Sequence, residues 1–336
     1  MSSDPIPSPT GGLTFDQIAQ FHRDGYLIVP SAIPPPYVQA LLAETHTLLS
    51  DFDLSSHPLT RFSTGEKSDH VGDDYFLNSG DAVRFFFEED AFSPTGELLK
   101  PKERAINKIG HYLHALSPPF AGLLDPALNP DLLGAGTSTG SVAAGRKESH
   151  PAAIARALGF ADPRVLQSMI ICKQPEIGGA VPPHQDSTFL YTNPPSAVGF
   201  WYALEDATQE NGCLSFLPGS HRWAPIKQRF VRAEQGGTTF VDNKEAEFPA
   251  GEEYGEDKKS NENGGAGADD AYVMGEVKAG DLVLIHGNLL HKSEKNVSQK
   301  GRIIYTFHVI EGQGKKYDGI NWLQPPAEGF TKLYRD

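Results

Sequence analysis

The second half of the chain has the pattern of a series of short strands, and this feature restricts the possible folds more than any other. From residue 165 onward, apolar runs of five to nine residues are separated by Gly, Pro and Asn. Such runs are typical of β-sandwiches and barrels. The predicted strands cover residues 165–173, 197–204, 213–217, 282–286 and 303–309. We therefore expect a mainly β fold with a double-sheet jelly-roll core.

Helix signals gather nearer the N-terminus. Thr14 and Gln17 have the spacing of a capping box, and residues 34–49 carry leucines at helical spacing. Residues 26–29, between the two predicted helices, are apolar and have the character of a short strand. We expect the helices to flank one sheet from outside.

Three segments interrupt this pattern. Residues 1–13 are rich in Ser, Pro and Gly, residues 129–151 contain a run of Gly, Ala, Ser and Thr, and residues 251–270 are mainly acidic residues, Gly and Asn. Such compositions are typical of flexible tails and mobile loops. Because the remaining sequence has no linker between two cores, we expect a single domain over residues 14–330 with mobile insertions at 129–151 and 251–270.

Charge and composition exclude several classes of function. The 336 residues include 29 basic and 43 acidic side chains, a formal net charge of −14, which excludes a basic nucleic-acid-binding surface. No window approaches the roughly 20 apolar residues of a membrane span, and the first residues do not resemble a secretory leader. The two cysteines, Cys172 and Cys213, indicate a reducing compartment. Without a peroxisomal signal, the default expectation is a cytoplasmic protein.

His184 and Asp186 are the first candidates for a metal site. On an extended segment, side chains two residues apart project from the same face, so an imidazole and a carboxylate could bind one ion. Two histidines and one carboxylate form the facial triad of non-haem Fe(II) oxygenases. A second pair with this spacing, His22 and Asp24, lies at the end of the first predicted helix, where residues two apart diverge. We interpret that pair as surface residues.

The third ligand is expected from residues 282–293, which contain His286 and His291. Because these two are five residues apart, a continuous strand would direct them to opposite faces. We favour His291, since Ser293 shares its face and Arg302 opens the next predicted strand. The Arg302 guanidinium could bind a co-substrate carboxylate through two hydrogen bonds, and Ser293 could add another. His286 is then expected to be a structural residue.

These segments carry a family resemblance. Residues 184–186, 211–221 and 291–302 together resemble the phytanoyl-CoA dioxygenase family of Fe(II)- and 2-oxoglutarate-dependent oxygenases, most closely its phytanoyl-CoA dioxygenase domain-containing members. The resemblance implies a double-stranded β-helix, the cupin-like form of the jelly roll, with flanking helices. It implies that Fe²⁺ is bound by His184, Asp186 and His291.

The resemblance also implies the reaction and the co-substrate site. Such an enzyme consumes O₂ and 2-oxoglutarate, with ascorbate in a supporting role, and releases succinate and CO₂. Its expected substrate is a small organic molecule, acyl or lipid-like or a specialised metabolite, that is hydroxylated or otherwise oxidised. The resemblance assigns the distal carboxylate of 2-oxoglutarate to Arg302 and Ser293, and the lining of its pocket to Lys108, Met169 and Trp201.

Two other classes of function use the same residues. A jelly roll can hold a metal or ligand without turnover, and a zinc hydrolase can use two histidines and one carboxylate. Neither class needs side chains that bind a co-substrate carboxylate beside the metal. Arg302 and Ser293 therefore favour the dioxygenase.

Overall fold

The computed structural model describes residues 12–62, 74–128, 148–243 and 271–334. The predicted insertion at 251–270 and most of the one at 129–151 lie outside these ranges. Of the predicted N-terminal tail, Gly12 and Leu13 are described, and Leu13 is buried in the core. None of the described helices is long and apolar enough to cross a membrane.

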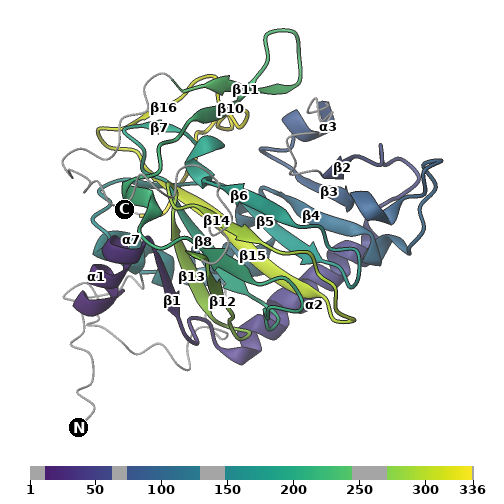
Figure 1. Ribbon diagram of the computed structural model, residues 1–336, viewed down its shortest axis with the longest axis horizontal. Coiled ribbons are helices and arrows are strands. Elements are labelled where there is room, and N and C mark those ends of the chain that lie inside the picture. Colours follow the sequence, from purple (N-terminus) through teal and green to yellow (C-terminus); the bar gives the residue numbers. More distant parts are fainter. Residues whose placement is uncertain (1–11, 63–73, 129–147, 244–270, 335–336) are drawn as a thin grey trace.

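A large sheet, the major sheet, forms the centre of the molecule (Figure 1). Its neighbouring strands are antiparallel except for the pair β2–β3. Their order is β1 (Tyr26–Val29), β13 (Leu282–His286), β8 (Val198–Ala203), β15 (Arg302–Glu311), β5 (Pro163–Lys173), β4 (Ile106–His111), β3 (Val83–Glu88) and β2 (Arg61–Phe62), with β17 (Thr331–Lys332) also paired to β5.

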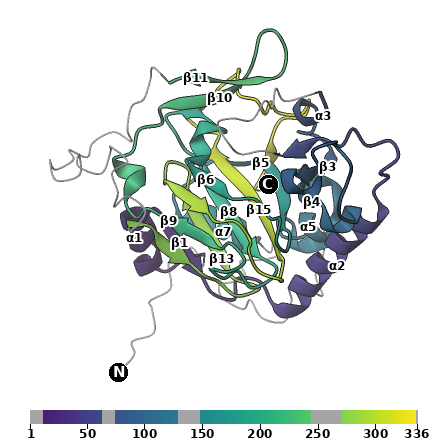
Figure 2. The same cartoon turned by 45° about the vertical axis from the view of Figure 1, so that its right-hand side comes forward.

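A smaller, minor sheet pairs four antiparallel strands and faces part of the major sheet. They follow the order β12 (Val273–Gly275), β9 (Leu214–Phe216), β14 (His291–Ser293) and β6 (Val181–His184). Two facing antiparallel sheets form the double-stranded β-helix that the sequence predicts. A hairpin of β10 (Gln228–Arg232) and β11 (Thr238–Asp242) lies at the top of the molecule in Figures 1 and 2.

Alternation along the central strands explains how two layers form. On β15, Tyr305 and Phe307 point to the outer side of the major sheet, where the Phe120 ring lies 4.5 Å from that of Tyr305. Ile304 belongs instead to the cluster between the two sheets, with Phe216 of β9. Because both faces of β15 are covered, the strand is buried almost throughout.

The two predicted helices and the intervening strand are present. α1 (Phe15–Asp24) begins with the capping box, in which Gln17 N donates to Thr14 Oγ1 at 3.2 Å and Thr14 N donates to Gln17 Oε1 at 2.8 Å. α2 (Pro35–Asp51) buries Tyr37 and Leu41 in the outer cluster. The pair His22 and Asp24 ends α1.

Shorter elements complete the described chain. They are the helices α3 (Asp74–Leu77), α4 (Leu113–Leu116), α5 (Pro118–Ala121) and α7 (His150–Ala157), the strands β7 (Thr192–Asn193) and β16 (Lys316–Tyr317), and the 3₁₀ turns η1 (Glu89–Ala91), η2 (Lys102–Arg104), η3 (Pro126–Leu128), η4 (Asp186–Thr188) and η5 (Ser220–Arg222). α7 begins at the end of the segment predicted as a loop at 129–151.

Candidate active site

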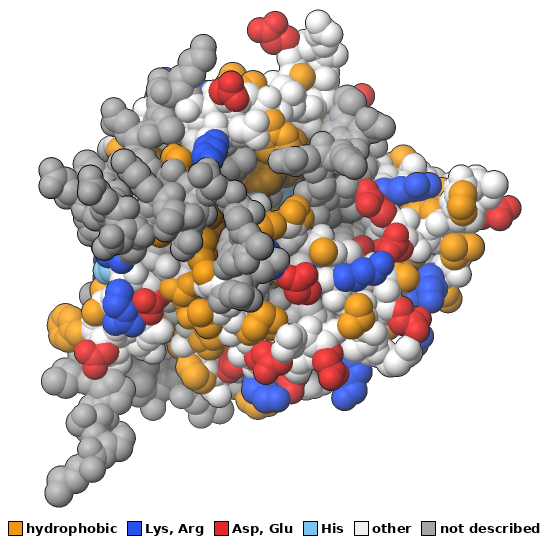
Figure 3. Space-filling model, viewed as in Figure 1, with side chains coloured by type: hydrophobic (Ala, Val, Ile, Leu, Met, Phe, Trp, Pro, Cys, Tyr) orange, Lys and Arg blue, Asp and Glu red, His pale blue; other side chains and the backbone are white. Residues whose placement is uncertain are grey.

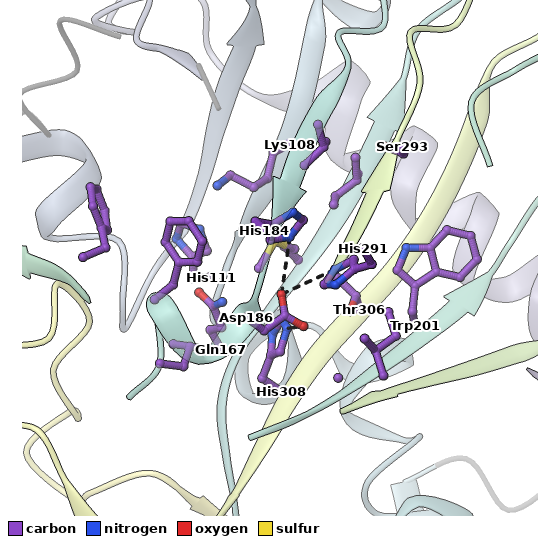
Figure 4. A pocket seen from close by; sticks show the side chains of 18 of the residues that line it. Lys108, His111, Gln167, His184, Asp186, Trp201, His291, Ser293, Thr306 and His308 are labelled. Atoms are coloured by element: carbon purple, nitrogen blue, oxygen red, sulfur yellow. Dashed lines mark ion pairs between the residues drawn. The ribbon is translucent and has the colours of Figure 1, made fainter. Parts of the chain in front are cut away.

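The three residues predicted as metal ligands come together between the two sheets. His184 ends β6, Asp186 begins η4, and His291, at the start of β14, lies directly opposite His184. Asp186 Oδ1 is 3.5 Å from His184 Nε2 and 3.7 Å from His291 Nε2 (Figure 4). One ligand atom from each residue lies within 4.8 Å of the others.

Hydrogen bonds to the backbone orient both imidazoles. His184 Nδ1 lies 2.9 Å from Pro182 O, and His291 Nδ1 lies 3.0 Å from Leu289 O. A carbonyl oxygen only accepts, so Nδ1 carries the hydrogen in each ring and Nε2 presents its lone pair to the centre of the triad. Two such nitrogens and one carboxylate oxygen suit Fe²⁺ or another transition metal.

His308 is a third histidine in this site, and no role was predicted for it from the sequence. Its Nε2 lies 3.2 Å from Asp186 Oδ2, on the oxygen that does not face the other two histidines. Burial alone would raise the pKa of Asp186, but His291, His308 and His184 together hold this pKa well below its ordinary value. Asp186 is therefore held as a carboxylate. The available sequence signal was the polar face that His308 shares with Arg302 on one strand.

Arg302 begins β15 and points into the same cavity. The side chain is 2% exposed, and its Nη1 donates to Gly212 O at 2.8 Å. Its guanidinium carbon lies 5.2 Å from the centre of the Trp201 ring. Burial lowers the pKa of Arg302 to about 10, so the group stays positively charged at neutral pH. Among the described residues, its Nε has no hydrogen-bond partner, which leaves a donor for a ligand.

Lys173 is a second buried basic residue, beside Arg302, and it was not predicted from the sequence. It lies opposite Arg302 in the β5–β15 register, and its Nζ donates to Ser293 Oγ at 2.9 Å and to Glu294 O. Burial and the charge of Arg302 lower the pKa of Lys173 to about 7, against the opposing effect of Glu88. Because the lysine occupies an acceptor position of Ser293 Oγ, the hydroxyl hydrogen remains available to a ligand in the cavity.

Lys108, Met169 and Trp201 also line the cavity. Met169, Thr306 and Trp201 form a row across β5, β15 and β8. Lys108 lies on β4, with its Nζ 5.3 Å from the centre of the Phe86 ring, and burial lowers its pKa well below the ordinary value. All eight residues named from the sequence thus surround one cavity of about 270 Å³.

The mouth of the cavity is aromatic. Phe189, Phe230 and Phe240 contribute to it, and Phe240 is 44% exposed, whereas Phe76 and Trp322 lie deeper and pack against the buried His111. In Figure 3, hydrophobic side chains gather in a hollow below the β10–β11 hairpin. The cavity therefore combines a polar interior with an apolar entrance.

His286 lies outside this cavity, as the sequence predicts. Its ring is 4.8 Å from that of His221 and 6.2 Å from that of Phe21, and its Nδ1 accepts a hydrogen bond from Asn288 N at 3.1 Å. Burial lowers the pKa of His286 to about 3. It is a neutral histidine packed against α1.

The amino-acid sequence of this chain is similar to those of known proteins. The sequence model of the phytanoyl-CoA dioxygenase (PhyH) family matches residues 21–304. The chain belongs to this family. It is 39% identical to "Phytanoyl-CoA dioxygenase domain-containing protein 1" of Bos taurus over 96% of this chain and 99% of the relative. It is 38% identical to "Phytanoyl-CoA dioxygenase" of Arabidopsis thaliana over 94% and 95%, respectively.

Solved structures share the fold of this PhyH-family chain. The epimerase SnoN, in a complex with Fe³⁺, α-ketoglutarate and nogalamycin RO, superposes with a TM-score of 0.53 at 17% identity and covers 96% of this chain and 93% of its own. EctD from S. alaskensis, with 2-oxoglutarate and 5-hydroxyectoine, gives 0.52 at 18% identity over 92% and 79%. The chain is thus a member of the 2-oxoglutarate-dependent non-haem iron dioxygenases, with a His-Asp-His triad.

Proposed function

We propose that this protein binds Fe²⁺ through His184, Asp186 and His291 and oxidises a small organic molecule with O₂ and 2-oxoglutarate, releasing succinate and CO₂. The observation that carries the proposal is the triad's position in the same cavity as the buried Arg302. A metal site alone is compatible with a binding protein or a zinc hydrolase. A buried guanidinium beside it is what a dicarboxylate co-substrate requires.

The residues around the cavity have separable roles in this proposal. When bound, Fe²⁺ would supply the chemistry that activates O₂. Arg302 and Ser293 would hold the distal carboxylate of 2-oxoglutarate, while Lys108, Met169 and Trp201 would line its pocket. His308 would orient the Asp186 carboxylate. The aromatic mouth would limit access of water.

The substrate of the family's namesake does not transfer directly to this chain. A coenzyme A ester brings several phosphates, so its binding site needs available cations. Residues 222–232 contain four basic side chains, Arg222, Lys227, Arg229 and Arg232, and two of these have other contacts: Arg229 pairs with Asp318, and Arg232 Nε donates to Trp322 O at 2.7 Å. These contacts favour a substrate smaller than an acyl-CoA.

Turnover of 2-oxoglutarate tests the proposal. Purified protein with Fe²⁺, ascorbate and 2-oxoglutarate is expected to form succinate slowly even without the organic substrate. Arg302→Ala should weaken 2-oxoglutarate binding by about 1.5–3 kcal/mol, because hydrogen bonds to a charged group are lost. Succinate is quantified by chromatography, and the affinity is measured by calorimetry on Zn²⁺-loaded protein. Absence of succinate from iron-loaded protein would instead favour the binding-protein hypothesis.

A further inference from the structure

His111 and Gln167 are two of the polar side chains in the cavity that remain once the metal and co-substrate residues are assigned. His111 ends β4, and Gln167 lies on the neighbouring strand β5. Both line the cavity, and both are at least nine-tenths buried. In Figure 4 they lie together on one side of the triad, whereas Ser293 and Trp201 lie on the other. His111 and Gln167 thus lie away from Ser293 and Trp201, two of the residues assigned to the co-substrate.

The hydrogen bonds of His111 define what its ring offers to a ligand. Ser79 Oγ donates its only hydrogen to Phe76 O at 2.5 Å, so it can only accept from His111 Nδ1, 2.7 Å away. Nδ1 therefore carries the hydrogen of the neutral ring. Burial, with a smaller effect of Lys108, keeps the pKa of His111 well below its ordinary value, so the ring stays neutral. Nε2 is consequently a hydrogen-bond acceptor.

The two acceptors have no partners in the part of the chain that the structure describes. Neither His111 Nε2 nor Gln167 Oε1 has a hydrogen-bond partner among the described residues. A buried polar atom without a partner costs about 1–3 kcal/mol, so such atoms in a ligand cavity indicate recognition of a ligand. The ring of His111 is fixed in place, because Trp322 and Phe76 pack against it with ring centres 5.2 and 5.8 Å away.

We infer that His111 Nε2 and Gln167 Oε1 bind the organic substrate, and that this substrate is an uncharged molecule with hydroxyl or amide N–H donors on an apolar body. The inference rests on the proposed function and names its substrate class. A carboxylate, ester or thioester oxygen would set its lone pairs against that of His111 Nε2, whereas a hydroxyl can donate to this nitrogen and also accept from the amide N–H of Gln167. An ammonium group would lose its hydration on entering, and Asp186, the one carboxylate among the described residues that line the cavity, belongs to the triad. The aromatic mouth accommodates the apolar body.

Matched probe molecules test this inference. The probes are 2-phenylethanol, its methyl ether, 3-phenylpropionate and hexanoyl-CoA, titrated into Zn²⁺-loaded full-length protein with 2-oxoglutarate and followed by saturation-transfer NMR. The alcohol is expected to bind about fivefold to tenfold more tightly than the ether, the ratio that one lost hydrogen bond produces. Equal binding of alcohol and ether, tighter binding of either anion, or no binding of the alcohol at millimolar concentration overturns the inference.

Two variants test whether the side chains of His111 and Gln167 cause the preference for the alcohol over the ether. His111→Phe keeps a ring between Phe76 and Trp322 but removes the acceptor, and Gln167→Leu removes the amide. Each should bring the alcohol-to-ether ratio close to one. Gln299→Leu, at an exposed position where the amide bonds Glu176, is the matched control and should retain the wild-type ratio. A ratio unchanged in both cavity variants contradicts the inference. The NMR signals of 2-oxoglutarate report separately on the proposed function, which fails if the co-substrate does not bind.

Discussion

At the scale of single residues, the candidate site depends on which nitrogen of each histidine faces the cavity. Pro182 O and Leu289 O fix Nδ1 of His184 and His291, so that Nε2 is directed at Asp186. His286 has the reverse arrangement, because its Nδ1 accepts a hydrogen bond from Asn288 N outside the cavity. The two histidines of the segment at 282–293 therefore differ in environment as well as in position.

This difference gives the first prediction. His291→Ala should abolish binding of one Fe²⁺ per chain, because it removes one of only two imidazoles in the triad, whereas His286→Ala should leave the stoichiometry close to one. Iron is measured after anaerobic loading and desalting, with circular dichroism as the control for folding. Loss of iron from a folded His286→Ala variant and its retention in His291→Ala would reverse the ligand assignment.

The sequence predicted some of these residues and missed others for a physical reason. His184 and Asp186 are two positions apart, so local geometry was enough to group them, and the spacing to Ser293 and Arg302 favoured His291. His308, His111 and Gln167 line the cavity, and Lys173 contacts Ser293 beside it, through contacts between distant segments. Polar residues on apolar strands were the available signal, and this signal does not indicate the sheet face on which each lies.

At the scale of elements, strand pairing places two basic side chains side by side. Lys173 at the end of β5 lies opposite Arg302 at the start of β15, and both are buried. Directly opposed like charges destabilise a sheet. Gly212 makes this arrangement possible, because a Cβ atom there would lie 2.7 Å from Lys173 Cδ, and the residue has φ +81°. Such a costly pair is expected where an anion binds.

The second prediction concerns Lys173→Met, which keeps the length of the side chain and removes its charge. The Kd for 2-oxoglutarate should rise about tenfold, because Ser293 loses its charged donor and the carboxylate loses a nearby cation. The Kd for 2-oxopentanoate, which has a methyl group in place of the distal carboxylate, should not change. Calorimetry on Zn²⁺-loaded protein measures both. Equal weakening of both ligands would indicate a purely structural lysine.

The elements themselves were predicted where hydrophobic periodicity is strong. The predicted strand at 282–286 and the capped helix α1 have the expected bounds, and the strand at 303–309 extends to Glu311 as β15. β3 and β4 were not predicted as strands, although Phe86 and Phe87 of β3 are fully buried. β3 pairs with β4, and β4 pairs with β5, which begins more than 50 residues later, so local sequence does not reveal this second pairing.

At the scale of the whole molecule, the candidate site connects the two sheets. His184 and His291 belong to the minor sheet, and His308 and Arg302 belong to β15 of the major sheet. Asp186 contacts histidines of both. Ligands that bind here should therefore stabilise the packing of one sheet on the other, and the effect should appear in global unfolding.

Thermal unfolding tests this connection. At a concentration about a hundred times its Kd, a metal that binds only the folded state adds about 2.7 kcal/mol to the free energy of unfolding. Mn²⁺ should therefore raise the unfolding midpoint by several degrees in the wild type and not in Asp186→Ala. 2-Oxoglutarate should raise it further when Mn²⁺ is present, but much less in Arg302→Ala, as followed by differential scanning calorimetry. An equal rise with 2-oxoglutarate in the absence of metal would mean that the co-substrate binds independently of the triad, contrary to the proposed arrangement.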